Sequence, residues 1–201
     1  MGKTNSPLPH TLHDKASYYG LLLLDKPKDK TSFYLVNVLR RLTGVRCIGH
    51  TGTLDPFATG VMAMLIGKPY TKLSQNFLLS DKEYQARVQL GTSTATFDCD
   101  GDITFTSDKV PTLEEIEAVC SEFQGTVLQT PPMFSAKKIK GKKLYELARQ
   151  GKTVHREPKE VTISLTIESY NYPYLDIYVK CSSGTYIRSI ADDIGKKLMT
   201  G

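Results

Sequence analysis

The most chemically suggestive part of the sequence is a stretch rich in glycine and threonine, GHTGTLDPFATG, at residues 49–60. It contains a single carboxylate, Asp55, which stands directly before Pro56. Because proline disfavours the helical conformation in the preceding residue, we expect Asp55 to project from an extended loop of restricted shape. A carboxylate held in this way can be aimed at a substrate. The alternative is an Asx turn in which Asp55 only caps its own backbone; the apolar stretch at 61–66 argues against it by anchoring the loop at the rim of a core.

An aimed carboxylate suits chemistry at a sugar carbon, as in glycosidases that use a carboxylate nucleophile. A carboxylate-dependent glycosidase or nucleosidase would normally need a second acidic group near Asp55, and residues 49–60 contain no other. This class of enzyme therefore stays an alternative rather than the preferred interpretation.

Positive charge is concentrated in residues 137–160, which hold nine basic and three acidic side chains in a chain whose net charge is +5. Such a run can be an ordinary solvated surface or a patch that binds phosphates, and composition alone favours neither interpretation. Gly141, Tyr145 and Gly151 indicate a basic loop with a short helix, which favours a polyanionic partner.

The elements that must position these residues alternate irregularly along the chain. Apolar alternation or short apolar runs predict strands at 20–26, 60–67, 83–90, 161–169 and 175–180. Capping residues and helical apolar spacing predict helices from Thr31 or Ser32 to Gly44, and at 70–79, 112–123 and 185–199. We expect a loop at 45–59 and an acidic turn at 98–102. This order favours one mixed, largely antiparallel α+β domain over a doubly wound parallel sheet.

Three of these elements also predict individual contacts. The first helix should bury one face, made of Phe33, Val36, Leu39 and Leu42. The strand at 83–90 should turn one set of side chains inward, namely Tyr84, Ala86, Val88 and Leu90. Thr112 and Glu115 have the spacing of a capping box at the start of a helix.

The composition excludes several classes of protein. With 201 residues and 40% hydrophobic side chains, the chain can bury a core without disulfides or a metal. The longest apolar run, Gly20 to Leu24, is too short to cross a bilayer, and residues 1–17 lack an apolar signal core, so we expect a soluble, cytoplasmic protein. The four cysteines lie tens of residues apart, which predicts reduced, mostly buried thiols rather than a metal site. Phosphate-binding glycine motifs do not occur, so a nucleotide cofactor is not expected.

Several segments together resemble the TruB family of tRNA pseudouridine(55) synthases, in the order in which the family has them. They are GLLLLDKP at 20–27 followed by Thr31 and Ser32, residues 49–60, KEY at 82–84, PPMFSAKK at 131–138, LYELAR at 144–149 and SGTYIRSIADDIG at 183–195. The resemblance runs from about residue 20 to the end of the sequence. It implies the pseudouridine synthase fold, a mixed, largely antiparallel bent sheet flanked by helices.

The resemblance implies that the chain converts uridine 55 in the T-loop of tRNA to its C-glycoside isomer, with Asp55 as the catalytic aspartate. Arg188 would pair with Asp55 and keep it ionised; the alternative is a surface arginine paired with Asp192, four residues later. Tyr84 would lie against the target base and help to deprotonate C5, and its alternative is ordinary core packing. Whether Asp55 adds to the sugar or mainly abstracts a proton stays open.

Contact with RNA is implied for a further set of residues, namely Lys26, His50, Lys137, Lys138, Lys142, Arg149 and Tyr186. His50 would lie where the target nucleotide leaves its stack, although a histidine in a polar loop is more often incidental. Lys26 and Pro27 would brace the strand that carries Tyr84, and Asp98 matches an acidic position with a structural role. The isomerisation has no redox step, so neither a cofactor nor a metal is expected. The expected partner is the T-arm stem-loop of tRNA, with no membrane, no obligate protein partner and a monomeric state.

The sequence departs from the family in two places. The first motif usually has a glycine where this chain has Asp29, and aspartate tolerates a positive φ only at a cost. The family also continues past the position of residue 201, often into a PUA domain. We therefore expect 19–201 to be a catalytic domain truncated at its C-terminus. Residues 1–18 are expected to form an N-terminal tail. A second alternative is a catalytically silent RNA-binding protein, which would bind T-arm RNA in the same cleft without isomerising it.

Overall fold

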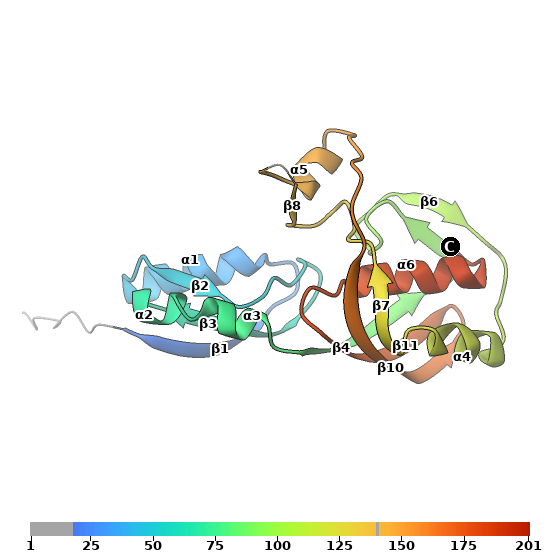
Figure 1. The fold of residues 1–201 in the computed structure, drawn as a ribbon, viewed down its shortest axis with the longest axis horizontal. Helices are drawn as coiled ribbons and strands as arrows, with labels where there is room; N and C mark the ends of the chain where they lie inside the picture. Colours follow the sequence, from blue (N-terminus) through green and yellow to red (C-terminus); the bar gives the residue numbers. More distant parts are fainter. Residues whose placement is uncertain (1–17, 140) are drawn as a thin grey trace, which may run out of the picture. The chain divides into compact units, whose positions relative to one another are not determined.

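The computed structural model describes residues 18–139 and 141–201, so all but the last residue of the tail expected at 1–18 lies outside the described residues. The chain divides into two compact units, the first ending at Leu78 and the second running from Leu79 to Gly201. Each unit has its own main sheet (Figure 1). Each also has its own hydrophobic core.

The first unit is built on a three-stranded antiparallel sheet in the order β1-β3-β2. The first strand, β1 (Gly20–Lys26), pairs along its whole length with β3 (Gly60–Ile66), and β2 (Ile48–His50) pairs with the second half of β3. The sheet and α1 (Ser32–Thr43) share a core that includes Met62 and Met64. The strands expected at 20–26 and 60–67 are therefore confirmed.

Helix α1 begins and ends where its sequence predicts. Thr31 is the N-cap, and its hydroxyl accepts a hydrogen bond from the Tyr34 amide at 3.2 Å. Gly44 ends the helix in the left-handed conformation, and its amide donates to the carbonyl of Arg40. A glycine adopts this conformation without the penalty of a Cβ atom, which explains why the helix stops there.

The face of α1 that packs on the sheet is narrower than the expected one. Val36 and Leu39 are buried as predicted, and Leu35 joins them. Phe33 and Leu42 are 54% and 75% exposed, because they lie at opposite margins of the buried stripe. Their assignment to the core was wrong.

Two other expectations for the first unit need correction. The loop expected at 45–59 contains β2, which is too short to show a periodic pattern and is defined only by its pairing with β3. The single helix expected at 70–79 is instead two short helices, α2 (Lys68–Thr71) and α3 (Ser74–Leu78).

The second unit has a four-stranded antiparallel sheet in the order β4-β11-β10-β7. Strands β10 (Lys159–Asn171) and β11 (Tyr174–Cys181), expected at 161–169 and 175–180, form a hairpin with Pro173 in its turn, and the peptide bond between Tyr172 and Pro173 is cis. Strand β4 (Lys82–Gln89) pairs with β11, and its side chains alternate between the core and solvent as expected. At the other edge lies β7 (Gly125–Gln129), which pairs with β10 and was not expected from the sequence.

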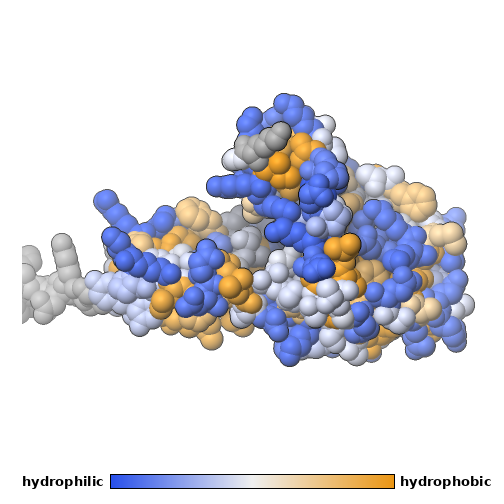
Figure 2. Space-filling model, in the orientation of Figure 1, coloured by the Kyte–Doolittle hydropathy of each residue, from blue (hydrophilic) through white to orange (hydrophobic). Residues whose placement is uncertain are grey.

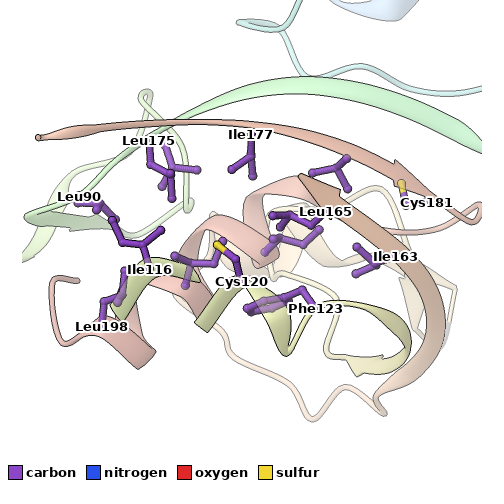
Figure 3. Close-up of a cluster of buried hydrophobic side chains, with 14 of the residues drawn as sticks. Leu90, Ile116, Cys120, Phe123, Ile163, Leu165, Leu175, Ile177, Cys181 and Leu198 are labelled. Carbon is purple, nitrogen blue, oxygen red and sulfur yellow. The ribbon is translucent and has the colours of Figure 1, made fainter. Parts of the chain in front are cut away.

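Helices α4 (Leu113–Ser121) and α6 (Ile187–Leu198) pack against this sheet and against each other. Figure 3 shows Leu175 and Ile177 of β11 pointing toward Ile116 and Cys120 of α4 within one continuous cluster of buried side chains. The capping box predicted for α4 is present, with both of its hydrogen bonds.

The remaining elements of the second unit are short. Strands β5 (Thr92–Thr94) and β6 (Ile103–Thr106) form a hairpin around the acidic turn expected at 98–102. The positively charged stretch at 137–160, called the basic segment below, contains a small hairpin of β8 (Lys138–Ile139) and β9 (Lys142–Lys143), followed by α5 (Leu144–Ala148). The surface around α5 and β8 is largely hydrophilic in Figure 2.

The α+β class is confirmed. Every pair of strands in residues 18–139 and 141–201 is antiparallel, with one main sheet in each unit and the two small hairpins in the second. Within the same residues, none of the helices has the length and apolar character needed to cross a membrane.

Candidate active site

The loop that carries Asp55 is fixed at both ends by the sheet of the first unit. It leaves β2 after His50 and enters β3 at Gly60, and the Thr51 amide donates to the carbonyl of Ala63 at 3.1 Å. Within the loop, the Ala58 amide donates to the main-chain carbonyl of Asp55 at 3.1 Å. This closes a turn with Pro56 in its second position, the place where the fixed φ of proline is favoured. Asp55 itself is partly buried.

The carbonyl of Pro56 accepts hydrogen bonds from two donors, one at the end of β1 and one shortly after it. The Lys26 ammonium donates to it at 3.0 Å, and the Asp29 amide donates to it at 2.8 Å. Asp29 has φ 62°, so the turn does require the left-handed conformation in which the family usually has glycine. Hydrogen bonds thus connect Pro56, the residue after Asp55, to Lys26 and Asp29.

Lys26 is fully buried, and its ammonium also donates to the carbonyls of Pro27 at 3.0 Å and Lys30 at 2.6 Å. Burial lowers the pKa of this lysine, and the nearby carboxylates of Asp29 and Asp55 partly oppose that effect. An ammonium enclosed by three carbonyls is not presented to a phosphate. The expectation that Lys26 contacts RNA therefore does not fit its geometry, and its contacts link the end of β1 to the Asp55 loop.

His50 is the last residue of β2 and is partly buried. Its Nδ1 atom is buried and has no hydrogen-bond partner within the described part of the chain. A buried polar atom without a partner is unusual in a folded protein, so this ring is not explained by packing alone.

Arg188, near the start of α6, is only 9% exposed. Its Nη1 donates to the carbonyl of Thr96 at 2.9 Å and to Oδ2 of Asp98 at 3.2 Å, and its Nη2 donates to the carbonyl of Phe134 at 2.9 Å. The alternative of a surface arginine paired with Asp192 is wrong, because Arg188 is buried and pairs with Asp98, whereas Asp192 pairs with Lys196 at 2.6 Å. Asp98, expected to be structural, is a partner of this guanidinium.

A side-chain clamp fixes the start of α6. The amide of Gln129, at the end of β7, donates to the carbonyl of Tyr186 at 3.1 Å and accepts from the Tyr186 amide at 2.8 Å. Gln129 is 5% exposed. Gln129 was not expected from the sequence, because the strand that ends with it, β7, was not predicted.

Tyr84 lies on β4 opposite Val179 of β11. It is partly buried, and its side chain packs against the core of the second unit. Tyr84 thus packs against the core, as its alternative interpretation expected, but part of the residue stays accessible to solvent.

The basic segment presents most of the cations expected to meet RNA. Lys138, Lys142 and Arg149 are exposed, whereas Lys137 is partly buried, and burial together with the charge of Lys159 lowers its pKa. Two cations lie over the ring of Tyr145, with its centroid 5.3 Å from the Lys143 ammonium and 5.5 Å from the Arg149 guanidinium.

The expected site residues thus form two groups, one in each unit. Asp55, Lys26 and His50 belong to the first unit, and Tyr84, Tyr186, Arg188 and the basic segment belong to the second. The four thiols are free, but only Cys120 and Cys181 are buried, while Cys47 and Cys99 are exposed. Residues 18–139 and 141–201 contain no cluster of three or more potential metal-binding side chains from His, Cys, Asp and Glu.

Comparisons with known proteins give a consistent result. The model of the TruB family pseudouridylate synthase N-terminal domain matches residues 40–187. The chain is 59% identical over 182 residues to tRNA pseudouridine synthase B of Protochlamydia amoebophila, covering 90% of this chain and 70% of that protein. It is 56% identical over 185 residues to the protein of the same name from Chlamydia trachomatis serovar L2, covering 92% of this chain and 77% of the other.

The fold is similar to a chain in a crystal structure of a Cbf5–Nop10–Gar1 complex, with a TM-score of 0.68 and 28% sequence identity. The match covers 91% of this chain but 45% of the other, so this chain spans less than half the length of that one. The expected pseudouridine synthase fold is confirmed by this similarity. The matched domain and the identity to relatives over most of their length show that the chain belongs to the TruB family of pseudouridylate synthases.

Proposed function

We propose that the chain isomerises uridine 55 in the T-loop of tRNA to pseudouridine. Membership in the family and the names of its relatives, tRNA pseudouridine synthase B, support a reaction on tRNA. The observation that carries the proposal is the Asp55 loop, whose flanking strands and Pro56 carbonyl are held by hydrogen bonds in the first unit. Because the loop is constrained, the Asp55 carboxylate is suited to a reaction that depends on how the catalytic group is oriented toward the substrate.

The reaction moves one glycosidic bond. The N1–C1′ bond of the uridine breaks, the base turns, C5 bonds to C1′, and the proton on C5 is lost while N1 gains one. Asp55 serves this sequence either by adding to the sugar carbon or by abstracting a proton, and both roles need an ionised carboxylate. The atoms balance within the nucleotide and solvent, so the proposed reaction requires no redox cofactor.

Arg188 and Tyr84 act with Asp55 in this proposal. A guanidinium whose direction is set by Thr96, Asp98 and Phe134 is suited to keep a partner carboxylate ionised as the substrate excludes water. Tyr84 supplies a ring for the extruded base and a hydroxyl for proton transfer at C5. Neither role follows from the fold class alone.

Recognition of RNA falls to the basic segment and to His50. Exposed Lys138, Lys142 and Arg149 would meet phosphates of the T-arm. Extruding the uridine costs a few kcal/mol, and the His50 ring would offset part of this by contact with the opened stack. The unpartnered Nδ1 of His50 supports a role beyond packing.

Release of tritium from C5 of labelled uridine in a T-arm stem-loop tests the proposal. Wild type should release the label, and Asp55→Asn should abolish release while RNA binding changes by no more than a few-fold. Asp25→Asn, an exposed carboxylate of β1 in the same unit, is the matched control and should keep wild-type activity. RNA binding by wild type without release would instead identify a silent RNA-binding protein.

A further inference from the structure

Two neighbouring hydroxyls at the start of α1 have different tasks. The Thr31 hydroxyl caps the helix by accepting from the Tyr34 amide at 3.2 Å. Because Thr31 already supplies the cap, the hydroxyl of Ser32 is available for a partner outside the helix. Ser32 is 4% exposed, so its side chain points into the protein rather than to solvent.

The partner of Ser32 is the backbone of Leu54, the residue directly before Asp55. The Ser32 hydroxyl donates to the Leu54 carbonyl at 3.0 Å and accepts from the Leu54 amide at 3.0 Å. One side chain thus holds both polar backbone groups of a residue 22 positions away. This pair of hydrogen bonds fixes the peptide units on both sides of Leu54 with respect to α1.

The residue on the other side of Asp55 is held as well. The Pro56 carbonyl accepts from the Lys26 ammonium and from the Asp29 amide. Asp55 therefore lies between two residues whose backbones are anchored to the segment 26–32. From this arrangement we propose that Ser32 is a positioning residue for Asp55, an inference that rests on the proposed catalytic role of that aspartate.

Removal of the Ser32 hydroxyl should act on the chemical step rather than on RNA binding. Misplacing a reacting group by about 1 Å can cost a rate factor of about 100, whereas contacts with RNA elsewhere would be unchanged. Ser32→Ala should therefore lower kcat by about 10- to 100-fold with KM within about 2-fold of wild type.

Thr31→Ala is the matched control, because it removes the adjacent hydroxyl and weakens the same helix without contacting Leu54. Both variants should lower the unfolding temperature, but only Ser32→Ala should lower kcat. Equal loss of kcat in the two variants, or wild-type kcat in Ser32→Ala, would overturn the proposal by making Ser32 a purely structural residue.

Amide hydrogen exchange measured by NMR tests the anchor independently of activity. The Leu54 amide should exchange at least about 10-fold faster in Ser32→Ala than in wild type, since its acceptor is gone, and at the wild-type rate in Thr31→Ala. Unchanged exchange at Leu54 in Ser32→Ala would refute the anchoring. A wild-type protein that releases no tritium would refute the proposed function, while faster exchange at Leu54 would still support the anchoring by Ser32.

Discussion

Asp98 and Arg188 form a buried ion pair, with 3.2 Å between Oδ2 and Nη1 and each side chain only 9% exposed. The other oxygen of Asp98 accepts from the Thr96 hydroxyl and from the Asp100 amide. The carboxylate therefore joins the turn between β5 and β6 to the first turn of α6. This connection orients the guanidinium on which the proposed reaction depends.

Asp98→Ala is expected to lower the free energy of unfolding by about 3 kcal/mol, because removal of one partner from a buried pair leaves the other charge with less compensation. Urea denaturation followed by circular dichroism measures the change. Asp98→Asn keeps the shape of the side chain and one acceptor oxygen, while an amide nitrogen replaces the other oxygen, so it should lose less stability than Asp98→Ala. A loss below about 1 kcal/mol for Asp98→Ala would contradict the role of the pair, since exposed pairs contribute that little.

Asp29→Gly should yield a more stable protein than Asp29→Ala, by about 1 kcal/mol. Position 29 has φ 62°, a conformation in which the Cβ of alanine is strained and glycine is not. The amide that donates to Pro56 is kept in both variants, so the comparison isolates the backbone preference. Thermal unfolding of the two variants beside wild type decides it, and equal midpoints for glycine and alanine would show that the turn tolerates any residue.

Asp176 should contribute to stability in a pH-dependent way. It faces Arg87 across β4 and β11, with 2.7 Å between Oδ1 and Nε, and hydrogen bonds from Arg87 and Ser169 lower its pKa from 3.8 to about 2. Since the folded-state pKa is depressed, the stabilisation is present above about pH 4 and is lost as the pH falls toward 2.

Unfolding midpoints of wild type and Asp176→Asn at pH 6 and pH 3 test this linkage. Wild type should be more stable than the variant at pH 6, and the difference should shrink at pH 3. In an Arg87→Gln background the same substitution should have a much smaller effect. A difference that does not vary with pH would assign the effect to packing instead of charge.

Binding of T-arm RNA should depend steeply on salt if the basic segment meets phosphates. Contact with about five phosphates predicts a slope of log K against log salt of roughly −3 to −5. Replacing Lys138, Lys142 and Arg149 by glutamine should reduce the magnitude of this slope by about 2 to 3. The matched control replaces three lysines of the same unit that pair with glutamates, Lys109, Lys180 and Lys197, and should leave the slope nearly unchanged.

Local interactions were predictable from the sequence. The capping box of Thr112 and Glu115 depends on residues three apart, and the inward set of β4 depends on simple alternation. Both are confirmed, because the determinants of each lie within one element.

Long-range interactions were not predictable in the same way. Lysine is normally a surface residue, and the burial of Lys26 depends on a carbonyl 30 positions away. Ser32 resembled a second capping residue, and only the path of the chain brings it to Leu54. Strand β2 has three residues and depends on its partner β3 for its definition. In each case the missing information is the tertiary neighbour.

Helix α6 supplies Ile190, Ile194 and Leu198 to the core of the second unit, and all three are almost completely buried. During synthesis these side chains leave the ribosome after every strand of the sheet that they cover. The first unit, by contrast, draws its sheet and α1 from residues 20–66. Its core can close while translation continues. The sheet of the second unit, however, stays partly uncovered until α6 is made, and we expect that interval to be its period of greatest exposure to aggregation.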